Sequence, residues 1–136
     1  MLADLDAFIK IVVDIQQGVM RIKERFLRDP VPRRLGALAA DLARIASAAP
    51  RPGNAQAIVA LMEEARRFVE WTAAETDLHA AAELVDIQLS LTLWLGGWQE
   101  ASKNASLRAA LGHSALCWSD RVLAFSGLVE PNPSSA

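Results

Sequence analysis

The sequence predicts an all-α fold, a single four- or five-helix bundle with a long N-terminal helix. Two observations support this prediction. Apolar residues recur at alternating steps of three and four along most of the chain, which is the spacing of one face of an α-helix. Proline, glycine and asparagine residues stand between these periodic segments, where helices would end or begin.

The first helix is predicted over residues 2–28, and its pattern is the most informative in the chain. A heptad seam extends over three repeats through seven apolar residues: Leu5, Phe8, Val12, Ile15, Val19, Ile22 and Phe26. A second apolar stripe lies beside the seam: Ile9, Val13, Met20 and Leu27. Because only a narrow polar ridge remains, this helix needs cover from its own bundle or from another chain. The seven seam residues are therefore the predicted interface of a homo-oligomer or of a complex with a protein partner.

The next two helices are separated by clear breaks. The segment 29–32 contains two prolines and ends the first helix, because proline lacks an amide donor and disfavours helix for the residue before it. A second helix is predicted over 33–48. The Pro- and Gly-containing loop 50–53 follows it, and Asn54 is predicted to cap the third helix.

The region after the third helix allows two interpretations. Thr72 and Glu75 have the spacing of a capping box, so either a new helix starts there or the third helix continues. Residues 87–95 alternate between apolar and other side chains with the period of a strand. Because a strand needs a partner and leucine favours helix, we predict a buried helix over 77–100. A kink or a close helix neighbour is expected at the Gly96–Gly97 pair.

The last helix is predicted over 105–125, with Asn104 as its N-terminal cap and Gly127 at its end. No repeat or linker divides the chain, so residues 1–130 form one predicted domain. Residues 131–136 are predicted to be a disordered tail, because they contain mostly proline and serine.

Composition narrows the class of protein. With 136 residues, 52% of them apolar and 22% charged, the chain resembles ordinary globular domains. A net charge of −2 disfavours nucleic acid as a partner. The longest apolar stretch is too short to span a bilayer, and no signal peptide is evident. The single cysteine fits a reducing cytosol, and the Ala- and Arg-rich usage suggests a bacterial source, so we expect a cytoplasmic bacterial protein without a membrane partner.

Charge is unevenly distributed along the chain. Residues 21–51 carry eight basic and three acidic side chains, whereas residues 63–86 carry two basic and seven acidic ones. These blocks of opposite sign either face each other, within the bundle or across a subunit contact, or form two solvated helix faces.

An acidic stripe is the sharpest candidate for chemistry. Four residues spaced four, four and three apart would share one helix face: Glu75, His79, Glu83 and Asp86. Carboxylates and an imidazole are ligands for divalent metals, which are the one cofactor the sequence suggests. The alternative is a polar outer stripe on an amphipathic helix.

The Glu83-Leu-Val-Asp86 segment, downstream of the glutamates and arginines at 63–67, resembles the all-α nucleotide pyrophosphohydrolases of the MazG and dimeric dUTPase type. The resemblance implies that Glu83 and Asp86 bind magnesium, which would hold a nucleoside triphosphate. The first half of that family's motif, Glu-x-x-Glu, is not matched, because Arg66 and Arg67 stand where the second glutamate belongs.

The spacing of Arg108 and His113 resembles that of the HEPN ribonucleases, which are small all-α dimers. The resemblance implies that Arg108 stabilises phosphate and that His113 acts as acid and base, with the residues of two subunits meeting over RNA. Ala109 departs from the polar residue that usually follows the arginine in that family.

Two further patterns concern single residue types. Cys117 follows His113 by four residues, which allows a thiol–imidazole pair with Asp120 nearby, or simply a small buried apolar side chain. Four tryptophans line an apolar ligand pocket or pack in the core: Trp71, Trp94, Trp98 and Trp118.

The sequence as a whole favours a non-catalytic interaction or assembly protein that acts through self-association or a protein partner. The ribonuclease and the pyrophosphohydrolase are the enzyme alternatives.

Overall fold

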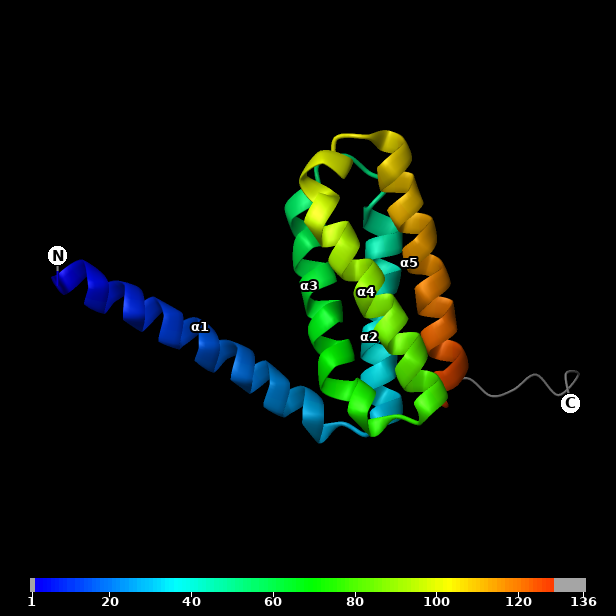
Figure 1. Cartoon of the computed structure of the whole chain (residues 1–136), viewed down its shortest axis with the longest axis horizontal. Helices are drawn as coiled ribbons and strands as arrows, with labels where there is room; N and C mark the ends of the chain where they lie inside the picture. The colour runs from blue at the N-terminus through cyan, green and yellow to red at the C-terminus, as the bar shows by residue number, and fades with distance from the viewer. Residues whose placement is uncertain (1, 129–136) are drawn as a thin grey trace, which may run out of the picture. The chain divides into compact units, whose positions relative to one another are not determined.

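The computed structural model describes residues 2–128, and its secondary structure is helical throughout (Figure 1). The elements in chain order are α1 (Leu2–Arg28), α2 (Val31–Ala48), α3 (Ala55–Thr72), the 3₁₀ turn η1 (Ala73–Glu75), α4 (Leu78–Ala101) and α5 (Ala105–Ser126). The predicted all-α bundle is thus confirmed. The chain separates into two compact units, an N-terminal unit, Met1–Pro30, and a bundle unit, Val31–Ala136.

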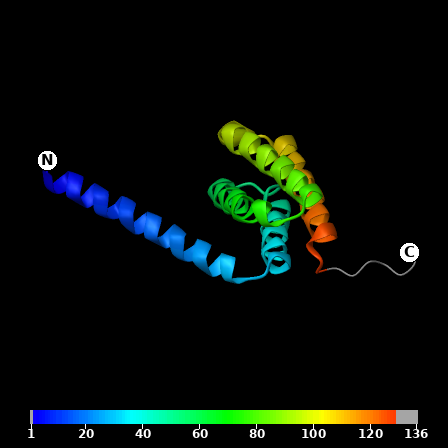
Figure 2. The same ribbon diagram turned by 60° about the horizontal axis from the view of Figure 1, so that its bottom comes forward.

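The bundle unit contains α2, α3, α4 and α5, which pack together (Figure 2). Their buried side chains form one apolar core. α2 contacts both α3 and α5, while α4 packs on α3 and less extensively on α5. Each helix contributes side chains that are fully buried, among them Leu42, Ile58, Leu84 and Leu111. Because these apolar faces cover one another, burial of their side chains stabilises the unit.

The contact between α2 and α5 is close because small residues line it. A Cβ atom on Gly112 would lie 3.0 Å from Pro50 Cγ and 3.1 Å from the carbonyl oxygen of Ala46. Along the same contact, the buried Ser119 hydroxyl donates a hydrogen bond of 2.8 Å to the carbonyl oxygen of Ala39. Glycine at position 112 therefore allows the backbone of α5 to approach α2.

The starts of α2 and α3 differ in detail from the predictions. α2 begins at Val31, two residues early, because Pro32 falls in the first turn, where proline is tolerated. α3 begins directly after Asn54, but the predicted cap by its side chain is wrong. The amide group of Asn54 donates instead to the carbonyl oxygen of Ala48, 3.4 Å away at the end of α2.

The predicted capping box at Thr72 and Glu75 does not form. Residues 73–75 form a 3₁₀ turn without a side-chain cap, and Thr76 is extended, with φ −101° and ψ 166°. α4 is capped instead by Asp77, whose side-chain oxygen accepts a hydrogen bond of 2.8 Å from the backbone N–H of Ala80.

The helix predicted over 77–100 is confirmed as α4, but it is buried on one face only. Ile87 and Leu91 are fully buried, whereas Leu89 and Leu93 are 58% and 70% exposed. The Gly96–Gly97 pair has no neighbour within 4 Å of an added Cβ in the described part of the chain. Of the two alternatives predicted at these glycines, the close helix neighbour is not found among residues 2–128, and the kink stays a prediction.

Both predicted ends of α5 are confirmed. The side-chain oxygen of Asn104 accepts hydrogen bonds from the backbone N–H groups of Ser106 and Leu107, at 2.9 and 3.1 Å. Gly127 ends the helix with a left-handed φ of 81°. The tail predicted over 131–136 lies outside the described residues, and a single domain over 1–130 stays a prediction.

Candidate functional site

The candidate site is the apolar surface of α1. Residues of the same segment determine where this helix begins and ends. Its 27 residues form a continuous helix with Asp4 in the first turn and Arg25 and Arg28 in the last. Charges of these signs at these ends complement the helix dipole and stabilise the helix. The helix ends before Pro30, which cannot continue the hydrogen-bond ladder.

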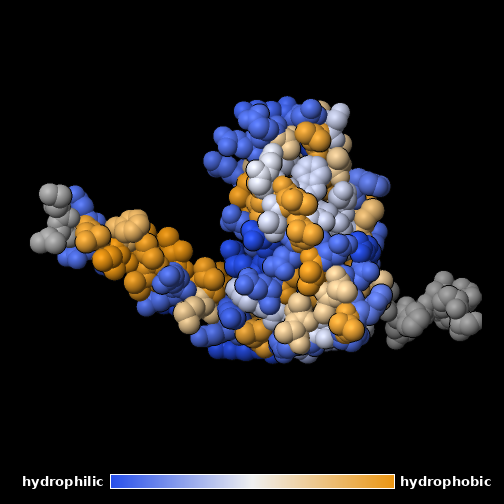
Figure 3. Space-filling model, viewed as in Figure 1, coloured by the Kyte–Doolittle hydropathy of each residue, from blue (hydrophilic) through white to orange (hydrophobic). Residues whose placement is uncertain are grey.

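Five of the seven predicted interface residues on α1 are exposed. The exposed fractions of Phe8 and Ile15 exceed 60%, and those of the others lie between 36% and 53%: Leu5, Val12 and Ile22. Val19 is half-buried and Phe26 is buried. Exposed apolar side chains of this size, side by side on one helix, mark interaction surfaces. Figure 3 shows hydrophobic residues gathered along this helix.

The apolar surface of α1 is wider than the seam. Ile9, Val13 and Met20 of the second stripe are exposed as well. Ile11 is also exposed, and it was missed because it belongs to neither predicted stripe. Ile11 directly precedes the seam residue Val12, and a residue at that heptad position flanks the seam. This position was the signal that could have identified it.

A second apolar surface lies on the outer face of α4, which Figure 3 also shows. Val85, Leu89 and Leu93 are exposed there at helical spacing. An open hollow of about 270 Å³ continues this surface toward α5, and it is lined by Leu93, Trp94, Gly97, Ala101 and Leu107. Sequence reasoning missed this surface, because the apolar run 87–95 was assigned entirely to the core.

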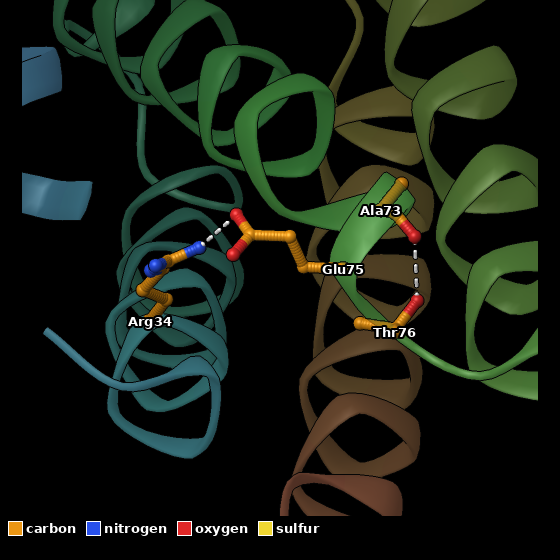
Figure 4. Close-up of polar contacts among 4 residues, drawn as sticks. All are labelled: Arg34, Ala73, Glu75 and Thr76. Atoms are coloured by element: carbon orange, nitrogen blue, oxygen red, sulfur yellow. Dashed lines mark hydrogen bonds and ion pairs between the residues drawn. The ribbon is translucent and has the colours of Figure 1, made fainter.

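The acidic stripe predicted on one helix face is divided. Glu75 lies in η1, before α4 begins, and its carboxylate accepts a hydrogen bond from Arg34 on α2 (Figure 4). Arg34 is buried, and this ion pair joins the basic block 21–51 to the acidic block 63–86. Glu75 therefore serves to hold the turn between α3 and α4 against α2.

The remaining residues of the stripe, His79, Glu83 and Asp86, lie on α4. Glu83 and Asp86 both form ion pairs with Arg121 of α5. His79, Glu83 and Arg121 line one open hollow between these helices. Among residues 2–128 no three His, Cys, Asp or Glu side chains are grouped so that they could hold a metal ion. The guanidinium of Arg121 is the positive charge that lies beside these two carboxylates.

The two halves of the motif that resembles the pyrophosphohydrolases point to different neighbours. Glu64 on α3 lies beside Asp41 of α2, whereas Glu83 on α4 pairs with Arg121 of α5. The two glutamates thus interact with residues of different helices, and a shared ion stays a prediction.

Arg108 and His113 are separated on α5. The Arg108 guanidinium donates a hydrogen bond of 2.9 Å to the carbonyl oxygen of Ser102, which secures the turn after α4. His113 is exposed five residues later, so the two side chains differ by about 140° around the helix axis. Within one chain they form no joint site; a pairing between two subunits stays a prediction.

Cys117 is an exposed free thiol whose sulfur lies 3.9 Å from His113 Nε2. The thiol–imidazole contact predicted from the spacing is thus present. The alternative of a buried apolar cysteine is wrong, because the side chain faces outward.

The tryptophans divide between core and surface. Trp98 and Trp118 are buried, and the indole N–H of Trp98 donates a hydrogen bond of 3.0 Å to the carbonyl oxygen of Ala55. Trp94 is partly exposed and lines the hollow beside α5.

A carboxyl pair between α2 and α3, of which Asp41 is buried and Glu64 half-buried, was not predicted. Asp41 is only 2% exposed, and its Oδ1 accepts a hydrogen bond of 2.8 Å from Arg44. Burial, together with the Glu64 carboxyl beside it, raises the pKa of Asp41 from 3.8 to about 7, although Arg44 acts in the opposite direction. The signal was present in the sequence, since Asp41 lies on the same face as Leu38 and Ile45.

Comparison with known proteins found no matching family model, no matching curated protein and no matching solved structure. None of the helices within residues 2–128 combines the length and the apolar content needed to cross a membrane.

Proposed function

We propose that this protein is a non-catalytic interaction or assembly protein that self-associates through α1. The observation that supports this proposal is the exposure of the seam. Five large apolar residues of one heptad pattern, from Leu5 to Ile22, are exposed on a helix that has no companion helix in its own unit. A seam of this kind is typical of helices that pair with another helix.

The energetics support pairing. Burying a Leu, Ile or Phe side chain gains about 1.5–3 kcal/mol when the side chain starts fully exposed. Even with half of that gain, five seam residues from each of two helices offset a large part of the association cost, which is about 4–15 kcal/mol. The outer face of α4 offers less, because its three exposed residues Val85, Leu89 and Leu93 are fewer than the five of the α1 seam.

The cytoplasm is the compartment we propose for this association. The exposed free thiol of Cys117 supports it, because such thiols persist where glutathione keeps them reduced.

The test is a charge placed in the seam. In Val12→Asp or Ile15→Asp, pairing would bury an uncompensated carboxylate, so we expect the variants to be monomers where the wild type is an oligomer. Sedimentation equilibrium measures this change. Gln17→Asp is the matched control, because it adds the same charge to an exposed position away from the seam.

The thermal melt of each variant shows whether the oligomer is lost because pairing fails or because the chain unfolds. Variants that are monomeric and still melt like the wild type support an intermolecular seam. A variant that simply unfolds would show that the seam is internal to one chain, and a wild type that stays monomeric at every concentration would contradict the proposal.

A further inference from the structure

The charges on α1 are arranged asymmetrically along its length. Residues 1–14 carry three aspartates and one lysine, whereas residues 15–28 carry four basic side chains and one glutamate. One end of the helix is therefore acidic and the other basic. Such a helix complements a copy of itself that runs in the opposite direction.

The residues next to the seam also indicate the direction of the partner helix. In heptad notation the seam residues occupy positions a and d, with Leu5 at a and Phe8 at d. The g positions, each directly before an a residue, are occupied by Asp4, Ile11, Gly18 and Arg25. All are placed to face a partner helix at the edge of the seam.

We infer that α1 pairs with α1 of a second copy of this chain in an antiparallel arrangement, with Leu5 of one copy opposite Ile22 of the other. This inference rests on the proposed function and assigns its partner and geometry. In this register every layer from Leu5 to Ile22 pairs an a residue with a d residue. The central layers consist of Val12 and Ile15 from the two copies.

Two independent features fit this register. First, g positions face g positions in an antiparallel pair, so Asp4 of each copy lies opposite Arg25 of the other. In a parallel pair Asp4 would face Ile9 instead, and the acidic ends would lie side by side. The antiparallel pair therefore gains an ion pair at both ends, and the helix dipoles also oppose each other favourably.

Second, the same register places Ile11 of each copy opposite Gly18 of the other. Ile11 is a large exposed side chain, and an added Cβ on Gly18 would have no neighbour within 4 Å. A glycine inside a helix lowers its stability, so an open glycine opposite a bulky residue is explained by close approach of the partner. In a parallel pair Gly18 would face Lys23, which needs no such space.

The deciding experiment measures distances between two copies of the full-length chain. Spin labels are attached to Ala3→Cys or Gln17→Cys, each in a Cys117→Ala background, and the label–label distance is measured by double electron–electron resonance. At 1.5 Å per residue, antiparallel pairing separates the two residues 3 by about 32 Å along the axis and the two residues 17 by about 10 Å. Both labels lie on the outer side of α1, away from the seam.

The outcomes separate the inference from the proposed function. A clearly longer distance at residue 3 than at residue 17 supports antiparallel pairing. Equal distances at the two positions would leave self-association intact and overturn the antiparallel arrangement. Absence of dipolar coupling at both positions would overturn self-association itself, and the inference with it.

A charge exchange provides a second readout. Asp4→Arg and Arg25→Asp each place like charges opposite one another in the antiparallel pair, so each should raise the dissociation constant by about tenfold at low salt. The double variant Asp4→Arg/Arg25→Asp restores both pairs and should return it close to the wild-type value. Additive weakening in the double variant would contradict the antiparallel register.

Discussion

α1 and α2 have the same kind of sequence pattern and different surroundings. Both are amphipathic helices with apolar residues at alternating steps of three and four. In α2, Leu38 and Leu42 are at most 1% exposed, whereas in α1 Phe8 and Ile15 are more than 60% exposed. α2 lies between α3 and α5, while α1 has no other helix in its own unit.

The difference teaches that periodicity specifies a helix and its apolar face, but not what covers that face. Cover depends on contacts between residues far apart in sequence, or on a second chain. The comparison predicts that mutations of α2 act on the folding of one chain, whereas mutations of α1 act on association between chains.

The largest effect on folding is expected from truncation of a buried leucine in α2. Leu42→Ala removes a side chain that is 0% exposed, and it should lower the free energy of unfolding by about 2–5 kcal/mol, because it leaves a cavity in the bundle core. Denaturant unfolding of the two proteins measures this difference.

Ile15→Ala on α1 is the matched substitution. It should leave the denaturant unfolding of the bundle unit within about 0.5 kcal/mol of the wild type and weaken self-association instead. Equal destabilisation by Leu42→Ala and Ile15→Ala would contradict the division between the two helices.

A smaller effect is expected at Asp41, the buried carboxyl of α2. Its pKa is about 7 in the folded chain and near 3.8 in the unfolded chain, so between these values the folded state binds the additional proton. Its contribution to stability therefore falls as pH rises from about 4 to about 7 and stays low above that range. Asp41→Asn should remove this dependence. The free energy of unfolding of the variant, relative to that of the wild type, should therefore be about 1–3 kcal/mol higher at pH 8 than at pH 4.

The measurement is the difference in free energy of unfolding between wild type and Asp41→Asn across pH 4–8, because subtraction cancels the titration of the other groups. Asp14→Asn on α1 is the control, since it makes the same substitution at an exposed carboxylate. Parallel pH profiles for wild type and Asp41→Asn would show that Asp41 titrates normally.

Local chemistry explains which parts of the fold were predictable. The cap at Asn104 and the left-handed Gly127 involve neighbours within a few residues, and both were predicted correctly. Asn54 and Glu75 have equally good local patterns, but other residues engage their side chains, through the Ala48 carbonyl and the Arg34 guanidinium. The sequence contains no local signal for such long-range contacts.

The candidate site was predictable to the same extent. The α1 seam is a regular pattern within one segment, so its residues could be named before the structure. The metal-site prediction depended on a helix continuing through Glu75, and an extended Thr76 interrupts that helix. The pairing of Glu83 with Arg121 joins residues 38 positions apart, and nothing near either residue indicates it.

The smallest effect is expected where a helix surface is open, and two glycines of the bundle unit test this. Gly96→Ala should raise the free energy of unfolding by about 0.5–1 kcal/mol, because alanine favours helix and the added Cβ has no neighbour within 4 Å. Gly112→Ala places the same methyl group 3.1 Å from a backbone oxygen of α2. This substitution should lower the free energy of unfolding by about 1 kcal/mol or more. Denaturant unfolding gives both values. A loss at Gly96 as well would mean that its surface is covered in solution, as we propose for the seam of α1.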